Sequence, residues 1–294
     1  ERSLYNAALD GLSLEGNRFF YGNPLASSGQ HYRRDWFGTA CCPSNISRLV
    51  ASVGDYIYAK SEDALWVNLF IGSKTKFQIG KVDVPMEMTT NYPLDGVIHL
   101  TLNPEQKAHF SVKLRLPGWA KEEPVPGGLY RFAGKSTEKF TLLLNGKVVP
   151  YTEENGYLTI TRTWEKGDQL QYSLPMEVRK LVARQEVTAN EDRIAIQRGP
   201  LVYCVEGADN NGKAWNLLIP ENATFTVFQH QVLDEKVMAV QAEMRVMTGS
   251  EDGTTLQAET KKITAIPYYT WTNRGQNEMQ VWLPTKIQEV KIIR

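Results

Sequence analysis

Apolar and polar residues follow two different periods along this chain, and the period changes near residue 60. In residues 1–59 the apolar positions recur at offsets of three and four, which is the spacing of one helix face. From residue 64 onward apolar and polar residues alternate, as in half-buried β-strands. The pattern predicts a short helical start followed by a long, mainly β region.

Two helices are predicted before residue 60. In the first, Leu4, Ala8 and Leu12 share a stripe, and no Ser, Thr, Asp or Asn precedes it to cap its first amides. We therefore expect this helix to begin upstream of Glu1, in a longer protein. The second helix starts at Pro43, and its apolar stripe is expected to be buried. This stripe consists of Ile46, Leu49, Val50, Val53, Tyr56 and Ile57.

Short strands are predicted over the remainder of the chain. The run 109–116 alternates strictly, with Phe110 first on the apolar side and His109 first on the polar side. The run 140–144 is followed by Asn145-Gly146, a strong signal for a two-residue hairpin turn. Many short strands with turns between them favour β-sandwiches. Further strands are predicted at 65–71, 74–79, 96–102, 156–162, 169–174, 192–197, 199–205, 223–228, 236–247, 261–269, 278–283 and 288–293, with a hairpin loop at 248–255.

Composition and pattern together predict three regions. Residues 1–59 form the helical segment, and residues 60–205 form a β-sandwich. The polar, glycine-containing stretch 206–213 is the best linker candidate, so we predict a second, smaller β-domain at 206–279. The end of the chain, 280–294, is expected to return to the first sandwich.

Charge and hydropathy exclude two classes of partner. Lys plus Arg and Asp plus Glu both number 33, so the formal net charge is zero, and no basic stripe suits a nucleic-acid backbone. No apolar run approaches the roughly 20 residues that a membrane-spanning helix needs. We expect neither nucleic acid nor membrane as a partner.

The adjacent thiols Cys41 and Cys42 are the strongest local chemical signal. They stand at the threshold of the second helix, where free amides and the positive helix end stabilise a thiolate. A thiolate can attack an electrophile or bind zinc, so the pair could divide these two duties. The alternative is two small buried hydrophobes that cap a helix. Cys204 lies in a strand-like run and is expected to be a buried hydrophobe.

Other candidate groups leave alternatives open. Each of the scattered histidines is expected to lie on the surface or in the core rather than to bind a metal. A zinc ion would therefore need ligands from residues that this chain does not contain. Near the cysteines, Tyr21, Trp36 and Phe37 suit a sugar face or a core equally well. The histidines are His31, His99, His109 and His230.

The longest distinctive motif is Trp-Phe-Gly-Thr-Ala-Cys-Cys-Pro-Ser-Asn at 36–45. With it, the chain resembles glycoside hydrolase family 127, the β-L-arabinofuranosidase type. The resemblance extends over nearly the whole chain, and its Cys-Cys-Pro block is the most specific part. The other matching blocks are 1–6, 18–25, 114–120, 167–168, 175–176, 195–203, 266–269 and Trp271 with 273–275.

This resemblance implies a fold and a set of roles. The two helices would be remnants of an (α/α)6 catalytic barrel that precedes β-sandwich domains. Cys41 matches the nucleophile, which also touches zinc, and Cys42 matches a zinc ligand. Glu1 and Tyr21 match positions that contact the sugar hydroxyls. The remaining zinc ligands and the acid/base glutamate would lie upstream and are absent from this chain.

Together these observations predict part of a zinc-dependent, retaining exo-glycosidase that removes L-arabinofuranosyl or related sugars from plant glycans. The fragment alone is expected to be inactive. The alternative is a non-catalytic carbohydrate-binding or interaction module in which the Cys pair is structural. The sequence leaves open the oligomeric state, where a homodimer through a β-sandwich is one option, and the compartment, periplasm or cytoplasm.

Overall fold

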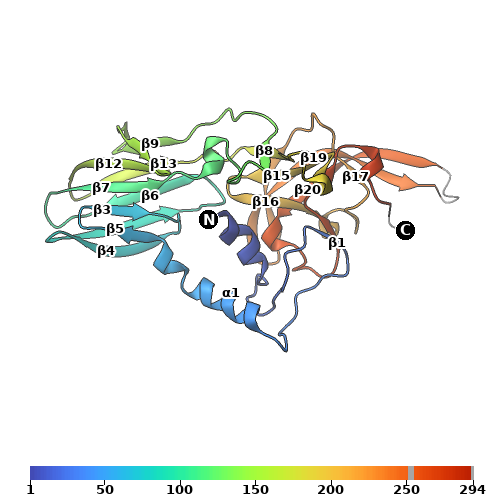
Figure 1. Cartoon of the computed structure of the whole chain (residues 1–294), viewed down its shortest axis with the longest axis horizontal. Coiled ribbons are helices and arrows are strands. Elements are labelled where there is room, and N and C mark those ends of the chain that lie inside the picture. The colour runs from blue at the N-terminus through green and yellow to red at the C-terminus, as the bar shows by residue number, and fades with distance from the viewer. Residues whose placement is uncertain (251–254, 293–294) are drawn as a thin grey trace. The chain divides into compact units, whose positions relative to one another are not determined.

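The computed structural model describes residues 1–250 and 255–292, and most of its elements are strands (Figure 1). The chain divides into two compact units. Unit 1 comprises residues 1–47, 125–135 and 178–294, and unit 2 comprises residues 48–124 and 136–177. The mainly β fold predicted from the alternating pattern is therefore confirmed.

Unit 2 is a β-sandwich of two sheets, visible as two layers in Figure 1. The first sheet has the order β10-β9-β13-β6-β5-β4, and the second has the order β11-β12-β7-β3-β2, in which β3 and β7 run parallel. The strands of the first sheet are β4 (Ser73–Ile79), β5 (Val82–Thr90), β6 (Val97–Leu102), β9 (Thr141–Leu144), β10 (Lys147–Val148) and β13 (Asp168–Ser173). Those of the second are β2 (Tyr58–Lys60), β3 (Ala64–Val67), β7 (Ala108–Arg115), β11 (Thr152–Glu154) and β12 (Tyr157–Trp164).

The alternating side chains of these strands make the core of unit 2. In β7 the apolar series from Phe110 to Leu114 is buried, as the pattern predicted. The two sheets meet through aromatic residues: the rings of Phe70 and Tyr172 pack edge to face with centroids 5.7 Å apart. The Tyr172 hydroxyl also donates to the Arg115 carbonyl of the opposite sheet at 3.4 Å. The backbones approach so closely at Gly96 that a Cβ there would overlap a neighbouring carbonyl oxygen.

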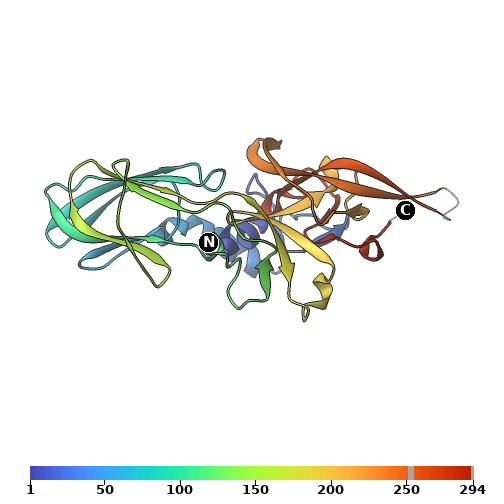
Figure 2. The same cartoon turned by 90° about the horizontal axis from the view of Figure 1, so that it is seen from above.

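Unit 1 is built on one large sheet with the order β17-β19-β20-β16-β15-β14-β8. Its longest hairpin, β19–β20, reaches beyond the other strands of this sheet (Figure 2). Shorter strands pair at the margins: β1 with β21, β18 with β19, β21 with β16 and β22 with β15. The strands are β1 (Ala26–Ser28), β8 (Tyr130–Phe132), β14 (Val178–Ala183), β15 (Arg193–Arg198), β16 (Leu201–Glu206), β17 (Leu217–Leu218), β18 (Thr226–Val232), β19 (Glu235–Gly249), β20 (Leu256–Pro267), β21 (Glu278–Gln280) and β22 (Leu283–Pro284).

Helical elements among the described residues are short. The chain starts with a helical segment that contains the π-helical turn η1 (Leu4–Ala8), and α1 (Cys41–Ala51) follows. None of the helices in residues 1–250 and 255–292 has the length and hydropathy needed to cross a bilayer. The remaining turns are the 3₁₀ elements η2 (Val53–Tyr56), η3 (Gly118–Lys121), η4 (Thr188–Asn190), η5 (Gly207–Asp209), η6 (Tyr268–Thr270) and η7 (Ile287–Glu289).

The domain boundary predicted at residue 206 differs from the structure. The stretch 206–213 folds as η5 and a turn inside unit 1, because β16 before it and β20 after it pair directly in one sheet. The end of the chain does pair with a strand of the region predicted as the first sandwich, since β22 pairs with β15, but both of these strands lie in unit 1. A polar, glycine-containing sequence can form a tight turn as readily as a linker.

The structure also corrects the two predicted helices. The first buries Asn6 and Asp10 rather than its apolar stripe. α1 begins at Cys41 rather than Pro43, and its predicted stripe is largely uncovered, with Leu49 38% exposed. Periodicity shows which residues share a helix face but not what covers that face.

At the C-terminus the strand predicted at 288–293 is replaced by η7 at its start, and residue 293 lies outside the described residues. The hairpin loop predicted at 248–255 falls between β19 and β20, where the Ser250 amide donates to the Thr255 carbonyl at 2.9 Å. Residues 251–254 of that loop also lie outside the described residues.

The sandwich of unit 2 predicts a contrast between two valines. Val112 is fully buried and Val148 is 83% exposed. Val112→Ala should lower the free energy of unfolding by about 2 kcal/mol, because a buried valine loses its transfer free energy. Val148→Ala should change it little. Urea unfolding measures both, and equal effects would contradict this core.

Candidate active site

Two exposed thiols lie side by side at the first turn of α1. The Sγ atoms of Cys41 and Cys42 are 3.8 Å apart, and both residues are exposed. The alternative in which they are buried hydrophobes is therefore wrong. Cys204, in contrast, is buried, as predicted, and burial raises the pKa of its thiol.

A tyrosine hydroxyl meets the first thiol. The Tyr21 oxygen lies 3.5 Å from the Cys41 sulfur and also contacts the Thr39 carbonyl. The edge of the Tyr21 ring packs against Phe37, with ring centroids 4.5 Å apart. Tyr21 is 44% exposed and Trp36 is 55% exposed, so neither is a core residue. The side chains of Tyr21 and Trp36 are therefore accessible to a ligand in this chain.

These contacts separate the acidities of the two thiols. The hydrogen bond with Tyr21, followed by that with Cys42, lowers the pKa of Cys41. The bond to Cys41 raises the pKa of Cys42 and contributes most to raising that of Tyr21 to about 12. The cause is simple: an ionised sulfur can only accept a hydrogen bond, so donors stabilise Cys41 as the thiolate. Of the two thiols, Cys41 is therefore the one that ionises more readily.

The spacing of the pair also suits a metal. Two thiolates bound to one tetrahedral zinc at about 2.3 Å are separated by roughly 3.8 Å. The observed Sγ–Sγ distance of 3.8 Å matches this value. In residues 1–250 and 255–292, no three His, Cys, Asp or Glu side chains gather in a way that could hold a metal ion. Within the described residues, the cysteine pair alone is thus fewer than the four ligands that a structural zinc site has.

A buried ion pair anchors the segments that carry Tyr21 and the cysteines. Arg33 donates to the Asp10 carboxylate at 3.0 Å, and both side chains are almost completely buried. The carboxylate also accepts hydrogen bonds from Asn23, Tyr268 and Trp271 at 2.9 to 3.1 Å. Burial raises the pKa of Asp10 and lowers that of Arg33, and their mutual attraction opposes both shifts. All the oxygens of this buried carboxylate are thus satisfied.

From this pair, aromatic packing continues to the site. The Arg33 guanidinium lies over the Phe20 ring at 4.5 Å, and Trp271 stacks with the same ring at 5.5 Å. Arg33 also donates to the Trp271 carbonyl at 2.6 Å. Both Arg33 and Trp271 therefore pack on Phe20. This packing positions the next residue, Tyr21, beside Cys41.

Another buried amide docks the first helix onto the sheet of unit 1. The Asn6 side chain donates to the Pro200 carbonyl and accepts from the Val202 amide, both at 2.8 Å. The polar residues Asn6 and Asp10, four positions apart in the apolar-rich run 4–12, were the sequence signal for these anchors. The periodicity argument, which follows apolar residues only, passed over them.

Glu1 stands at the start of the first helix. Its carbonyl accepts from the Tyr5 amide at 3.0 Å. Burial first, and the Glu1 charge second, raise the pKa of the Tyr5 phenol. The structure thus brings Cys41, Cys42 and Tyr21 together, while the sugar-contacting roles of Glu1 and Tyr21 stay predictions.

Comparison with protein families gives a consistent assignment along the chain. Three models match in order: the β-L-arabinofuranosidase GH127 catalytic domain at residues 1–55, the GH127 middle domain at 64–176 and the glycoside hydrolase family 127 C-terminal domain at 178–284. The limits of the last two models fall close to the junction of the two units near residue 177.

Individual relatives agree. A non-reducing end β-L-arabinofuranosidase of Bifidobacterium longum is 30% identical over 96% of this chain and 44% of its own length. A solved GH127 β-arabinofuranosidase is 36% identical with a TM-score of 0.94, covering 98% of this chain and 45% of that one. A GH127 β-L-arabinofuranosidase from Geobacillus stearothermophilus T6 is 34% identical with a TM-score of 0.84, covering 97% and 45%. The chain belongs to glycoside hydrolase family 127, and it spans less than half the length of these relatives.

The Tyr21 contact predicts a shift in thiol reactivity. Tyr21→Phe removes a donor to the Cys41 thiolate, so the pKa of Cys41 should rise and its alkylation should need a higher pH. The midpoint of the pH profile, measured by iodoacetamide labelling and peptide mass in the presence of a chelator, should move upward. Tyr151→Phe, at a tyrosine of similar exposure (42%), should leave it in place. An unmoved midpoint in Tyr21→Phe would rule out the contact.

The two Asp–Arg pairs of this region predict opposite outcomes. Asp10→Asn leaves Arg33 buried without its counter-charge and should lower the free energy of unfolding by about 3–5 kcal/mol. Asp35→Asn breaks the pair with Arg18, in which the Asp35 side chain is 87% exposed, and should leave the unfolding midpoint unchanged. Urea unfolding of both variants measures the difference. Tolerance of Asp10→Asn would show that the buried pair anchors nothing.

Proposed function

We propose that this chain is part of a retaining exo-glycoside hydrolase that removes L-arabinofuranosyl or related sugars from plant glycans, with Cys41 as its nucleophile. The observation that carries the proposal is the exposed Cys41–Cys42 pair with its 3.8 Å sulfur separation. The names of the relatives support the sugar, and membership of family 127 supports glycoside hydrolysis.

In this proposal each residue of the site has a distinct role. Cys41 and Cys42 would hold a zinc ion, which would keep their sulfurs ionised at neutral pH. The Tyr21 hydroxyl, 3.5 Å from Cys41, fixes the direction of the attacking sulfur and contacts the sugar with Glu1. Phe37 packs against the Tyr21 ring and supports its position, and Trp36 packs against Phe19.

The chemistry then needs two displacements at the anomeric carbon. The Cys41 thiolate attacks this carbon, the glycosidic C–O bond breaks, and a carboxylic acid outside this chain protonates the departing oxygen. Water then attacks the same carbon, gives up a proton to that carboxylate and releases the sulfur as thiolate. Two inversions give overall retention of configuration. A low-pKa sulfur suits both steps because it attacks and also leaves.

Cys41 is tested in the longer protein that contains the complete catalytic domain. Cys41→Ser should reduce release of L-arabinose from an aryl β-L-arabinofuranoside by at least about a thousandfold, as expected for loss of a nucleophile. Cys42→Ser should reduce bound zinc, measured by elemental analysis. Cys204→Ala is the matched control, since Cys204 is buried in unit 1 and should not affect either readout.

Two results separate this proposal from the alternative of a non-catalytic module with a structural Cys pair. If Cys41→Ser alters the melting temperature but not turnover, the alternative is supported. If the longer protein binds one zinc and loses turnover in Cys41→Ser at unchanged melting temperature, the proposal is supported. The 294-residue chain alone should show no turnover.

A further inference from the structure

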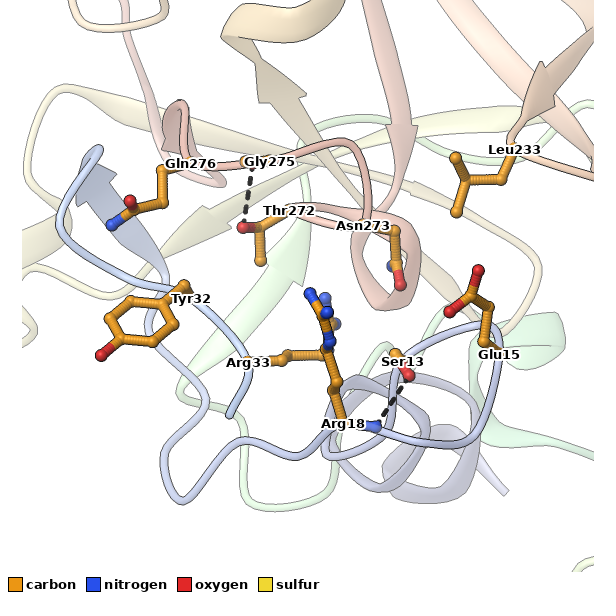
Figure 3. Close-up of a pocket in the computed structure, with 10 residues that line it drawn as sticks. All are labelled: Ser13, Glu15, Arg18, Tyr32, Arg33, Leu233, Thr272, Asn273, Gly275 and Gln276. Carbon is orange, nitrogen blue, oxygen red and sulfur yellow. Dashed lines mark hydrogen bonds between the residues drawn. The ribbon is translucent and has the colours of Figure 1, made fainter. Parts of the chain in front are cut away.

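A second concave site lies in unit 1, apart from the cysteines. It is a cavity of about 480 Å³, within the range of ligand pockets (Figure 3). Four segments contribute to its wall: the turn after the first helix, the loop at 32–33, the β18–β19 turn and the segment after η6. The lining residues are Ser13, Glu15, Arg18, Tyr32, Arg33, Leu233, Thr272, Asn273, Gly275 and Gln276.

The wall of this cavity is fixed by its own hydrogen bonds. The Asn273 side chain accepts from the Leu14 amide and donates to the Thr270 carbonyl, both at 2.9 Å. The Ser13 hydroxyl accepts from the Arg18 amide at 3.1 Å. Gly275 adopts a φ of 103°, a conformation that favours glycine, and its carbonyl accepts from Thr272 at 3.1 Å. A ligand would therefore bind a preformed cavity, and the entropic cost of ordering the cavity wall would be small.

Polar groups with unused hydrogen-bonding capacity face this space. Figure 3 shows Arg18 rising between Ser13 and Arg33 toward Thr272 and Asn273. Only the Arg18 Nε is engaged, with Asp35 at 3.1 Å. Within residues 1–250 and 255–292, the terminal nitrogens of Arg18 have no hydrogen-bond partner.

Two more unpartnered groups lie on the other side of the cavity. The Tyr32 hydroxyl and the Gln276 amide make no hydrogen bond with any residue in the described part of the chain. Tyr32 is 50% exposed, and the Arg34 guanidinium lies 5.6 Å from the centre of its ring. Its hydroxyl points away from Arg18 in Figure 3, so it is the ring that borders the cavity. The Gln276 side chain points toward Tyr32 in Figure 3. A planar amide beside an aromatic ring can bind the hydroxyls and the C–H face of a sugar at once.

Charge decides which ligand fits. Three guanidinium groups lie at or beside the cavity: Arg18, Arg33 and Arg34, the last 5.6 Å from the centre of the Tyr32 ring. Asp35, Asp10 and Glu15 match them in number, so the formal charges cancel and leave no excess positive charge for an anion. Glu15 adds a carboxylate at the rim that would repel one. A guanidinium, a carboxylate, an amide and a phenol together match a neutral ligand with many hydroxyls.

We infer that this cavity binds a neutral saccharide of one or two units without cleaving it. The choice of carbohydrate rests on the proposed function, but the lining chemistry supports it independently. The same two chain segments carry both sites: residues 18–21 contribute Arg18 here and Tyr21 at the cysteines, and residues 32–37 contribute Tyr32 here and Phe37 there. A glycan bound in this cavity would therefore contact the same chain segments that carry the residues proposed to act on it.

Binding is tested on the 294-residue chain by isothermal titration with L-arabinose, D-galactose and xylobiose as probes and inorganic sulfate as the anion comparison. At least one sugar should bind saturably with a dissociation constant of about 1 mM, and sulfate should not compete. Arg18→Gln should weaken binding about tenfold, because it removes hydrogen bonds from a charged donor. Tyr32→Ala should weaken it by a similar factor.

Arg184→Gln is the matched control, because Arg184 is similarly exposed (53% against 59% for Arg18) and also paired with a carboxylate, Glu186. It should bind sugar normally. The inference is overturned if no probe binds saturably, if Arg18→Gln and Tyr32→Ala bind like the parent chain, if sulfate displaces the sugar, or if Arg184→Gln abolishes binding. None of these results bears on cleavage by the longer protein.

Discussion

The buried carboxylate of Asp10 is the constraint on which the site depends. A charge with no access to water is tolerated only when an opposite charge and hydrogen-bond donors surround it. Here Arg33 supplies the charge, and Asn23, Tyr268 and Trp271 supply the donors. Two of these partners, Tyr268 and Trp271, lie more than 200 residues after Asp10 in the sequence. The hydrogen bonds of this one carboxylate therefore hold together the first helix, the following loop and the end of β20.

The buried Asp10 carboxylate explains how the sheet of unit 1 influences the Cys41 thiol, which lies outside that sheet. Trp271, which follows β20, binds Asp10 with its indole and Arg33 with its carbonyl, and it stacks on Phe20. Tyr21 comes next in the chain and reaches Cys41. The chemistry of the sulfur thus depends on a β-rich unit through three successive contacts, each between named side chains. A catalytic segment supported in this way is preorganised rather than mobile.

The sequence revealed the alternating strands and the cysteine pair because both are local signals. The buried series of β7 and the Asn145-Gly146 turn followed directly from a period of two and from turn chemistry. Strand β5 was missed although Val84, Met86 and Met88 alternate with less buried residues, because a proline such as Pro85 ordinarily argues against a strand inside a sheet. The structure places β5 between β4 and β6. The spacing of Asn6 and Asp10 hinted at a buried polar face, but Arg33 as the partner of Asp10 could not be predicted, since a charged side chain in a helix is ordinarily on the surface. The domain boundary predicted at residue 206 differs from the structure for a related reason. Amino-acid composition does not show which distant strands pair with each other.

The central claim is that the Cys41 sulfur forms the bond to the sugar. The most direct measurement is the mass of peptides from the longer protein, quenched with acid during turnover of a slow aryl β-L-arabinofuranoside. The account predicts an added anhydropentose on the peptide that contains Cys41, attached at its sulfur. An added pentose on a carboxylate instead, or steady turnover after selective alkylation of Cys41, would contradict it.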